Sequence, residues 1–347
     1  DLEQYEDRLK ASLGPGGEVM RGLIARARRR PMKVVLTDGY NERVIRAAQE
    51  IVEEGIAAPV LIGREDKVNE IATLHGLDLE GVEIVHPIMS EKVRHGYADA
   101  LYSARKRKGL TSAEARSRMY QPNYFAGMMV RQGDADAMVG GIESHYSELI
   151  RPALEVIGRA EGVRKVAGMY VVALRDRELL FFGDTAVNIE PNADTLTDIA
   201  LLTAGFVEKL GILPRIAMLS FSNFGSVRHP GSEKVRRAVM QVKELRPDIE
   251  IDGEMQADTA LNTEILKAQY PFSDLKKAAN VLIFPGLASA NSAYKLLAEL
   301  GGAEVIGPIL LGMRHPVHFL QRGSTVQDIV NLVTLASVDA QARATQG

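Results

Sequence analysis

Short apolar runs alternate with longer amphipathic segments along most of the chain after Met32. The short runs are rich in Val, Ile and Leu, which favours buried strands. The predicted strands are 33–36, 59–62, 82–85, 137–139, 166–174, 216–219, 281–284 and 305–306. The amphipathic segments predict helices at 43–53, 91–107, 195–210, 233–245, 293–300 and 326–337. This alternation indicates an α/β fold with mostly parallel sheets covered by helices.

The N-terminal region follows a different pattern. Apolar residues recur at helical spacing from Leu2 to Leu13, and the Gly-Pro-Gly-Gly run at 14–17 is expected to end that helix. A second amphipathic segment, 19–27, leads into three arginines, which we interpret as a solvated helix end. Residues 1–30 therefore resemble a linker that precedes a domain.

Composition narrows the class of protein. The chain has 347 residues, 46% of them apolar, which predicts roughly two domains. Its 42 basic and 45 acidic side chains argue against a nucleic-acid-binding surface. The absence of cysteine excludes disulfides and thiol catalysis. No apolar run approaches the ~18 residues of a membrane helix. We therefore expect a cytoplasmic protein without membrane contacts, and the initial Asp1 suggests a piece of a longer chain.

Several catalytic signatures are missing from the sequence. It contains neither the phosphate loop of nucleotide-binding proteins nor the Gly-x-Gly-x-x-Gly dinucleotide fingerprint, and it has no His-Glu-x-x-His pair. His315 and His318 have a spacing that could suit a metal, but Pro316 between them breaks a helical face. We expect a loop or surface role for these histidines and no metal site.

Polar residues gather directly after three predicted strands, at 37–39, 140–144 and 220–223. In open α/β sheets these carboxyl-end loops are where ligands bind. The loop 220–226 combines hydroxyl groups with a glycine before a helix. It suits either a phosphate held by backbone N–H groups or a capped helix start.

Four charged residues lie near the ends of predicted elements. Arg105, Arg151 and Arg322 are individually typical of surface or paired arginines, but together they could clamp phosphate oxygens. Asp328 lies in the first turn of the last predicted helix. There it either complements the helix dipole or acts together with Arg322.

With these residues assembled, the chain from about 32 to 342 resembles the phosphate acetyl/butyryltransferase family. The resembling segments are 104–111, 149–154, 186–188, 252–258, 307–312 and 322–330. The resemblance implies two α/β/α domains, as in phosphotransacetylases and isocitrate dehydrogenases, with an interdomain cleft and a homodimer or higher homo-oligomer. Domain one would comprise 31–162 plus 309–347, and domain two 163–308.

The resemblance also implies roles for individual residues. The family transfers an acetyl group between acetyl phosphate and coenzyme A. Asp328 matches the aspartate that takes the thiol proton. Arg105, Arg151 and Arg322 match the arginines that hold phosphate and coenzyme A.

Three departures from the family pattern bear on activity. Gln321 stands where active members have a serine, and His318-Phe319 replaces Asn-Asp. Phe224 replaces a lysine in the loop 222–226. Because losing one oxyanion donor alone costs ~10²–10³-fold in rate, we expect no appreciable acetyl transfer.

These departures, and the segment 5–10, resemble the degenerate C-terminal domain of bacterial hybrid NADP-dependent malic enzymes. The leading hypothesis is therefore a non-catalytic regulatory domain that binds acetyl-CoA as an inhibitory effector and helps to oligomerise its enzyme. The missing N-terminal malic enzyme half would decarboxylate malate to pyruvate and would alone bind NADP and a divalent metal. The expected effector-binding residues are Arg322, Arg105, Arg151, Gln321, Asn291, Ser222, Asn223 and Ser226. The alternatives are an active phosphate acetyltransferase and a purely structural dimerisation module.

Overall fold

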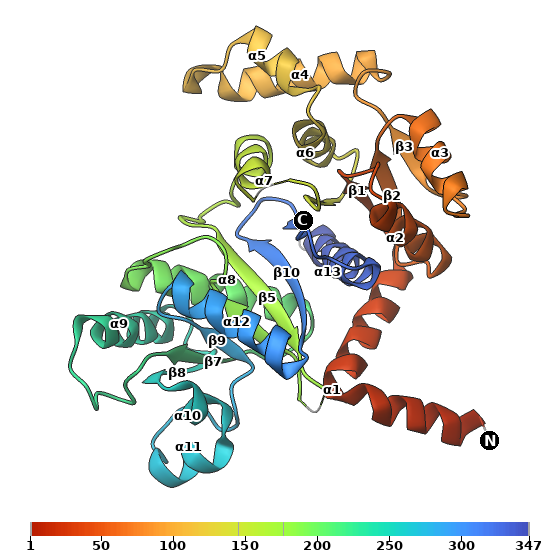
Figure 1. Cartoon of the computed structure of the whole chain (residues 1–347). Helices are drawn as coiled ribbons and strands as arrows, with labels where there is room; N and C mark the ends of the chain where they lie inside the picture. Colours follow the sequence, from red (N-terminus) through yellow and green to blue (C-terminus); the bar gives the residue numbers. More distant parts are fainter. Residues whose placement is uncertain (1, 145, 176, 346–347) are drawn as a thin grey trace. The chain divides into compact units, whose positions relative to one another are not determined.

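The computed structural model describes residues 2–144, 146–175 and 177–345 (Figure 1). They form two compact units. The terminal unit contains Gly22–Glu161 and the segment from Met313 onward. The central unit contains Gly162–Gly312 and the start of the chain up to Arg21. Both units combine β-strands with α-helices, so the predicted α/β class is confirmed.

The terminal unit is built on a parallel sheet with the order β3-β2-β1-β4-β11. Its strands are β1 (Met32–Leu36), β2 (Ala57–Ile62), β3 (Glu83–Val85), β4 (Ala137–Gly140) and β11 (Val317–Phe319). Its helices are α2 (Glu42–Glu53), α3 (Glu65–Leu74), α4 (Glu91–Arg105), α5 (Ser112–Arg118), α6 (Pro122–Gln132), α7 (Tyr146–Pro152) and α13 (Val326–Ala344). Two single turns, Lys106–Lys108 and Ala153–Ile157, extend α4 and α7.

Helix α13 is the central helix of this unit. It packs on α2, β1 and β4, so the last helix of the chain covers strands from the first half (Figure 1). Every residue from Ile329 to Gln341 is buried. A helix that is buried on all sides requires mostly small and apolar residues, as this segment has.

The central unit has a mixed sheet with the order β10-β5-β6-β9-β7-β8. The first three strands pair antiparallel and the remaining ones parallel. The strands are β5 (Ala167–Ala173), β6 (Leu180–Gly183), β7 (Arg215–Leu219), β8 (Glu250–Met255), β9 (Val281–Ile283) and β10 (Glu304–Leu311). The helices are α8 (Ala193–Lys209), α9 (Pro230–Leu245), α10 (Ala257–Leu261), α11 (Thr263–Gln269) and α12 (Leu287–Gly301).

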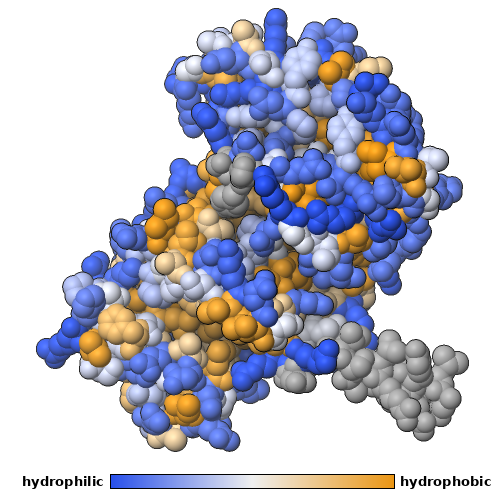
Figure 2. Space-filling view, viewed as in Figure 1, coloured by the Kyte–Doolittle hydropathy of each residue, from blue (hydrophilic) through white to orange (hydrophobic). Residues whose placement is uncertain are grey.

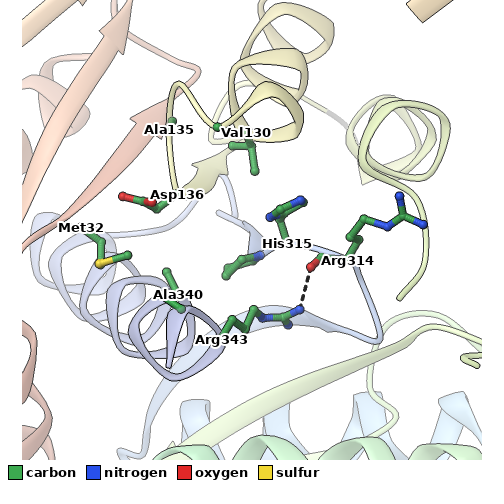
Figure 3. A pocket seen from close by; sticks show the side chains of 11 residues that line it. Met32, Val130, Ala135, Asp136, Arg314, His315, Ala340 and Arg343 are labelled. Carbon is green, nitrogen blue, oxygen red and sulfur yellow. Dashed lines mark hydrogen bonds between the residues drawn. The ribbon is translucent and has the colours of Figure 1, made fainter. Parts of the chain in front are cut away.

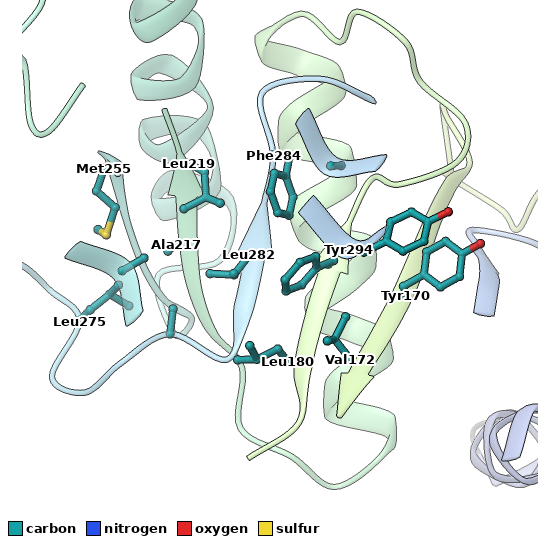
Figure 4. Close-up of a cluster of buried hydrophobic side chains, with 14 of the residues drawn as sticks. Tyr170, Val172, Leu180, Ala217, Leu219, Met255, Leu275, Leu282, Phe284 and Tyr294 are labelled. Atoms are coloured by element: carbon teal, nitrogen blue, oxygen red, sulfur yellow. The ribbon is translucent and has the colours of Figure 1, made fainter. Parts of the chain in front are cut away.

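Aromatic side chains fill part of the core of the central unit (Figure 4). Tyr170 of β5 stacks on Tyr294 of α12 with a centroid distance of 4.3 Å. The ring centroids of Phe182 on β6 and Phe284 are 5.1 Å apart. The first contact joins the sheet to the helix that covers it, and the second joins β6 to the residue that follows β9.

The N-terminal helix differs from the prediction. Helix α1 (Leu2–Arg29) continues through the run 14–17, so the expected break there is wrong. Glycine and proline lower helix propensity, but tertiary packing can outweigh this cost. Such packing exists at Gly16, where an added Cβ would lie 3.2 Å from Leu179 Cδ2. Among the described helices, none combines the length and the apolar composition that a membrane span requires.

Candidate functional site

The carboxyl ends of β1, β4 and β11 form one edge of the terminal sheet, because β4 pairs with both other strands. The loops that leave these strands are joined by hydrogen bonds. Gly141 N donates to Asp38 Oδ2 at 2.6 Å, and Leu320 N donates to Gly140 O at 2.8 Å. Gly140 leaves no space for a side chain, since an added Cβ would lie 1.8 Å from Thr37 Oγ1. The loops after β1 and β4 were among the ligand-binding loops that the sequence predicted, at 37–39 and 140–144.

The third loop carries three of the residues singled out by the sequence. Gln321 and Arg322 are exposed directly after β11, and Asp328 is half-buried in the first turn of α13. Gln321 N donates to Ser324 Oγ at 3.0 Å, which closes the loop into a turn. The structure therefore places Gln321, Arg322 and Asp328 on one short loop–helix junction.

Asp328 has a structural role at this junction. Its backbone N–H donates to Thr325 Oγ at 3.2 Å, and Thr325 N donates to Asp328 Oδ2 at 2.7 Å. This reciprocal pair is a capping box, which stabilises the N-terminus of α13. No hydrogen bond from the described residues reaches Asp328 Oδ1.

A second group in the terminal unit brings Arg105 and Arg151 together around Glu155. Arg151 Nε lies 3.1 Å from Glu155 Oε1, and Arg105 Nη2 lies 3.9 Å from the same oxygen. Arg118, which sequence analysis did not single out, pairs with Glu155 Oε2. Tyr124 also donates to Oε2, at 2.7 Å. Three arginines against one glutamate give this cluster a net charge of +2.

The acidic centre of the cluster is held as a carboxylate. Burial acts to raise the pKa of Glu155, but hydrogen bonds from Tyr124 and Arg151 and the charges of Arg118 and Arg105 outweigh it, so this pKa is lowered. Burial and the bond to Glu155 raise the pKa of Tyr124 to about 12. Figure 2 shows a mostly hydrophilic surface over α4 and α5, which end in Arg105 and Arg118.

In the central unit, the loop after β7 folds around a buried carboxylate. Ser222 Oγ and Gly225 N donate to Glu254 Oε1 at 3.0 and 2.7 Å. Asn223 N donates to Ser226 Oγ at 3.1 Å. Several groups expected to face a phosphate are therefore bonded within the protein. The next helix, α9, is capped by His229 and not by the hydroxyl groups of this loop.

Asn291 lies on α12 of the same unit and is half-buried. Its Nδ2 donates to Tyr294 OH at 3.4 Å, one turn further along the helix. This contact ties its amide to the aromatic core of the central unit.

The two histidines of the 315–318 segment lie in different surroundings. His318 is fully buried in β11, so the expected loop or surface role is wrong for it. His315 lines a cavity of about 280 Å³ at the amino-terminal edge of the terminal sheet (Figure 3). Burial and the nearby charges of Arg343, Arg314 and Arg131 lower the pKa of His315.

The arginines around this cavity mainly serve the fold. Arg343 donates to the carbonyl oxygens of Met313 and Arg314 at 2.8 and 3.0 Å and pairs with Asp339. Arg131 donates to Val156 O at 2.6 Å. Within the described ranges, no group of three or more His, Asp or Glu side chains could hold a metal ion.

Comparisons with known proteins extend over nearly the whole chain. Residues 18–337 match the family described as phosphate acetyl/butaryl transferase. A phosphate acetyltransferase of Clostridium acetobutylicum is 40% identical over 315 residues, 89% of this chain and 94% of that protein. A phosphate acetyltransferase of Nitratidesulfovibrio vulgaris is 40% identical over 92% of this chain, which spans only 45% of that protein. The solved EutD phosphotransacetylase from Staphylococcus aureus is 32% identical with a TM-score of 0.86, covering 93% of this chain and 98% of that one.

These matches contradict the expected regulatory role. Three relatives named phosphate acetyltransferase are 39–40% identical and are covered over 94–99% of their own length. A relative named NADP-dependent malic enzyme, from Rhizobium meliloti, is 37% identical, but the chain spans only 44% of it. The hypothesis of a non-catalytic acetyl-CoA sensor within a malic enzyme is therefore wrong, and the alternative of an acyl-transferring enzyme has better support.

Proposed function

Because the chain belongs to the phosphate acetyl/butaryl transferase family, we propose that it is an active phosphate acetyltransferase. It would transfer an acetyl group between acetyl phosphate and coenzyme A, and acetyl-CoA would be a substrate, not an effector. The observation that carries this proposal is the junction from Gln321 to Asp328 at the carboxyl edge of a parallel sheet, where a cation lies in the loop after β11 and a carboxylate lies in the first turn of α13.

The proposed chemistry needs one base and one cation. Asp328 Oδ1 would take the proton from the thiol of coenzyme A, and the thiolate would attack the acyl carbonyl carbon. A carbon–sulfur bond forms, the bond between the acyl carbon and the phosphate oxygen breaks, and phosphate leaves with the electron pair. Arg322 would stabilise the negative charge that develops on the oxygens of the reacting group.

Gln321 is compatible with this chemistry. The family has a serine hydroxyl at this position, and a glutamine carboxamide also offers hydrogen-bond donors. A donor at the end of a longer side chain can still reach a carbonyl oxygen, because Gln321 is exposed at the turn. The substitution therefore changes the donor without removing it.

Coenzyme A would be held in part by the arginine cluster on Glu155. Its net charge of +2 suits phosphate groups, and the Arg151 side chain is 73% exposed. In the central unit, Asn223, Ser226 and Asn291 remain proposed contacts. Ser222 is fully buried, so we propose that it positions its loop.

We also propose that the chain forms a homodimer or a higher homo-oligomer, as the resemblance to its family implies. Light scattering on the purified chain would measure its mass, and a monomer at micromolar concentration would contradict this proposal.

The proposed function is tested by measuring thioester formation from acetyl phosphate and coenzyme A. Asp328→Asn keeps an acceptor for the capping box but removes the base, so we expect kcat to fall at least ~10²-fold. Thr325→Val is the matched control. It loses the other half of the capping box, at a cost of about 0.5–2 kcal/mol in stability, and keeps the carboxylate.

Two outcomes would contradict the proposal. The first is an absence of turnover by the folded wild-type chain. The second is an equal loss of activity in Asp328→Asn and Thr325→Val, which would mean that Asp328 only caps α13.

A further inference from the structure

Arg43 joins the first turn of α2 to the loop that carries Gln321 and Arg322. Its Nη1 donates to Ser324 O at 2.5 Å, and its Nη2 donates to Arg322 O at 3.1 Å. The two carbonyl groups are two residues apart on the loop and about 280 positions away in the sequence. One planar guanidinium therefore fixes the backbone on both sides of Gly323.

The backbone of Arg43 is itself held in place by a neighbouring side chain. Asn41 caps α2 by accepting a hydrogen bond from Arg43 N at 3.0 Å, and its Nδ2 donates to Glu143 Oε1 at 3.0 Å. Glu143 belongs to the loop after β4. The position of Arg43 is thus tied to two of the three loops at the carboxyl edge of the terminal sheet.

Arg43 differs from a surface arginine in the partners it uses. The neighbouring Glu42 pairs with Arg46 at 2.9 Å, and no carboxylate among the described residues is ion-paired with Arg43. The residue is half-buried, and its guanidinium binds neutral backbone carbonyls. A rigid fork of donors can hold two acceptors at a defined spacing, which a lysine cannot do.

We propose that Arg43 is a positioning residue for acyl transfer: its two hydrogen bonds hold the loop so that Arg322 and Asp328 face the reacting group together. This inference rests on the proposed function. Arg43 acts on the backbone of Arg322 and does not touch the substrate. A misplacement of about 1 Å at a reacting centre can cost ~10²-fold in rate, so a small relaxation of this loop is sufficient for a large effect.

The test compares Arg43→Lys and Arg43→Ala with Arg46→Ala in the full chain. Arg46 lies on the same helix, and its ion pair with Glu42 is exposed, so its loss should leave turnover unchanged. We expect Arg43→Lys to lower kcat at least tenfold, with Arg43→Ala lower still. The KM for coenzyme A should stay within about twofold of the wild type, because the proposed phosphate-binding cluster on Glu155 does not include this loop.

Hydrogen exchange of the backbone amides at 321–325 supplies a readout that does not depend on activity. Exchange there should accelerate in Arg43→Lys and not in Arg46→Ala. If the wild type proves inactive, faster exchange still supports the positioning of the loop while the proposed function fails. If Arg43→Lys retains wild-type kcat, or if exchange at 321–325 is unchanged, the inference is wrong. If Arg43→Ala does not fold, Arg43→Lys alone decides.

Discussion

Glu155 holds three arginine side chains in the terminal unit, and its replacement by glutamine should destabilise that unit measurably. Its side chain is only 13% exposed. It is the shared partner of Arg105, Arg118 and Arg151, which otherwise repel one another. Glutamine keeps the size of the side chain but removes the charge and turns one acceptor into a donor.

The expected loss follows from the burial of the carboxylate. Removing one partner from a buried ion pair costs ~3–5 kcal/mol, whereas exposed pairs contribute ~0–1 kcal/mol. Because Arg151 is largely exposed, we expect Glu155→Gln to lower the free energy of unfolding by about 2–3 kcal/mol. A unit of this size loses about 2–4 °C in Tm per kcal/mol, which predicts a decrease of about 4–12 °C.

The pH dependence has a definite sign. Since the pKa of Glu155 is lowered in the folded protein, its contribution to stability is fully present above the pKa of the unfolded chain, about 4.3. The contribution disappears as the pH falls through the folded pKa. The difference between wild type and Glu155→Gln should therefore be constant at neutral pH and shrink below about pH 4.3.

Thermal unfolding followed by circular dichroism at a series of pH values measures this difference. Glu54→Gln is the control, because the pair of Glu54 with Arg28 is about half exposed and its loss should cost at most about 1 kcal/mol. Equal effects of the two substitutions at neutral pH would refute the argument. So would a difference for Glu155→Gln that persists unchanged in acid.

Three further predictions concern other parts of the terminal unit. Gly140→Ala should lower stability by at least ~1–3 kcal/mol in denaturant titrations, because its Cβ would overlap Thr37 Oγ1, whereas Gly22→Ala meets no neighbour within 4 Å and should not destabilise. His315→Asn should flatten the fall in Tm as the pH drops below about 6.5, because a lowered pKa makes protonation of His315 destabilising; an unchanged slope would contradict this. Gln321→Ala should lower kcat by ~10²-fold while Gln321→Ser keeps activity, and equal kinetics of the two variants would show that no donor is needed there.

The sequence predicted those elements whose patterns are local. The apolar runs at 137–139 and 216–219 fall within β4 and β7, because strands covered on both faces are almost entirely apolar. Strand β8 was not predicted, because Asp252 and Glu254 interrupt the apolar pattern. Both carboxylates are buried, and Asp252 accepts hydrogen bonds from Ser273 Oγ and Asp274 N at 2.8 Å. Those partners lie 21 and 22 residues further along the chain, beyond the reach of a strand or helix pattern.

The same distinction applies to the candidate site. Arg322 and Asp328 are only six residues apart in the sequence, so a motif could identify both. Arg43 and Arg118 act through partners on other elements, the loop after β11 and Glu155. No local pattern marks such contacts. Among the three arginines that pair with Glu155, Arg151 alone has a helical i,i+4 spacing to it, which a sequence can reveal.

The substitutions that suggested an inactive protein have different meanings once their positions are known. His318 and Phe319 replace two polar residues of the family, yet both are buried in β11, where they contribute to the packing of the strand. Phe224 replaces a lysine, and its ring centroid lies 4.9 Å from that of Tyr270 and 5.0 Å from that of Phe272. Of these departures, Gln321 is the one whose side chain is exposed beside Arg322, and it retains hydrogen-bond donors. Because positions 318 and 319 lie inside β11, a change there is weaker evidence against catalysis than a change at the exposed position 321.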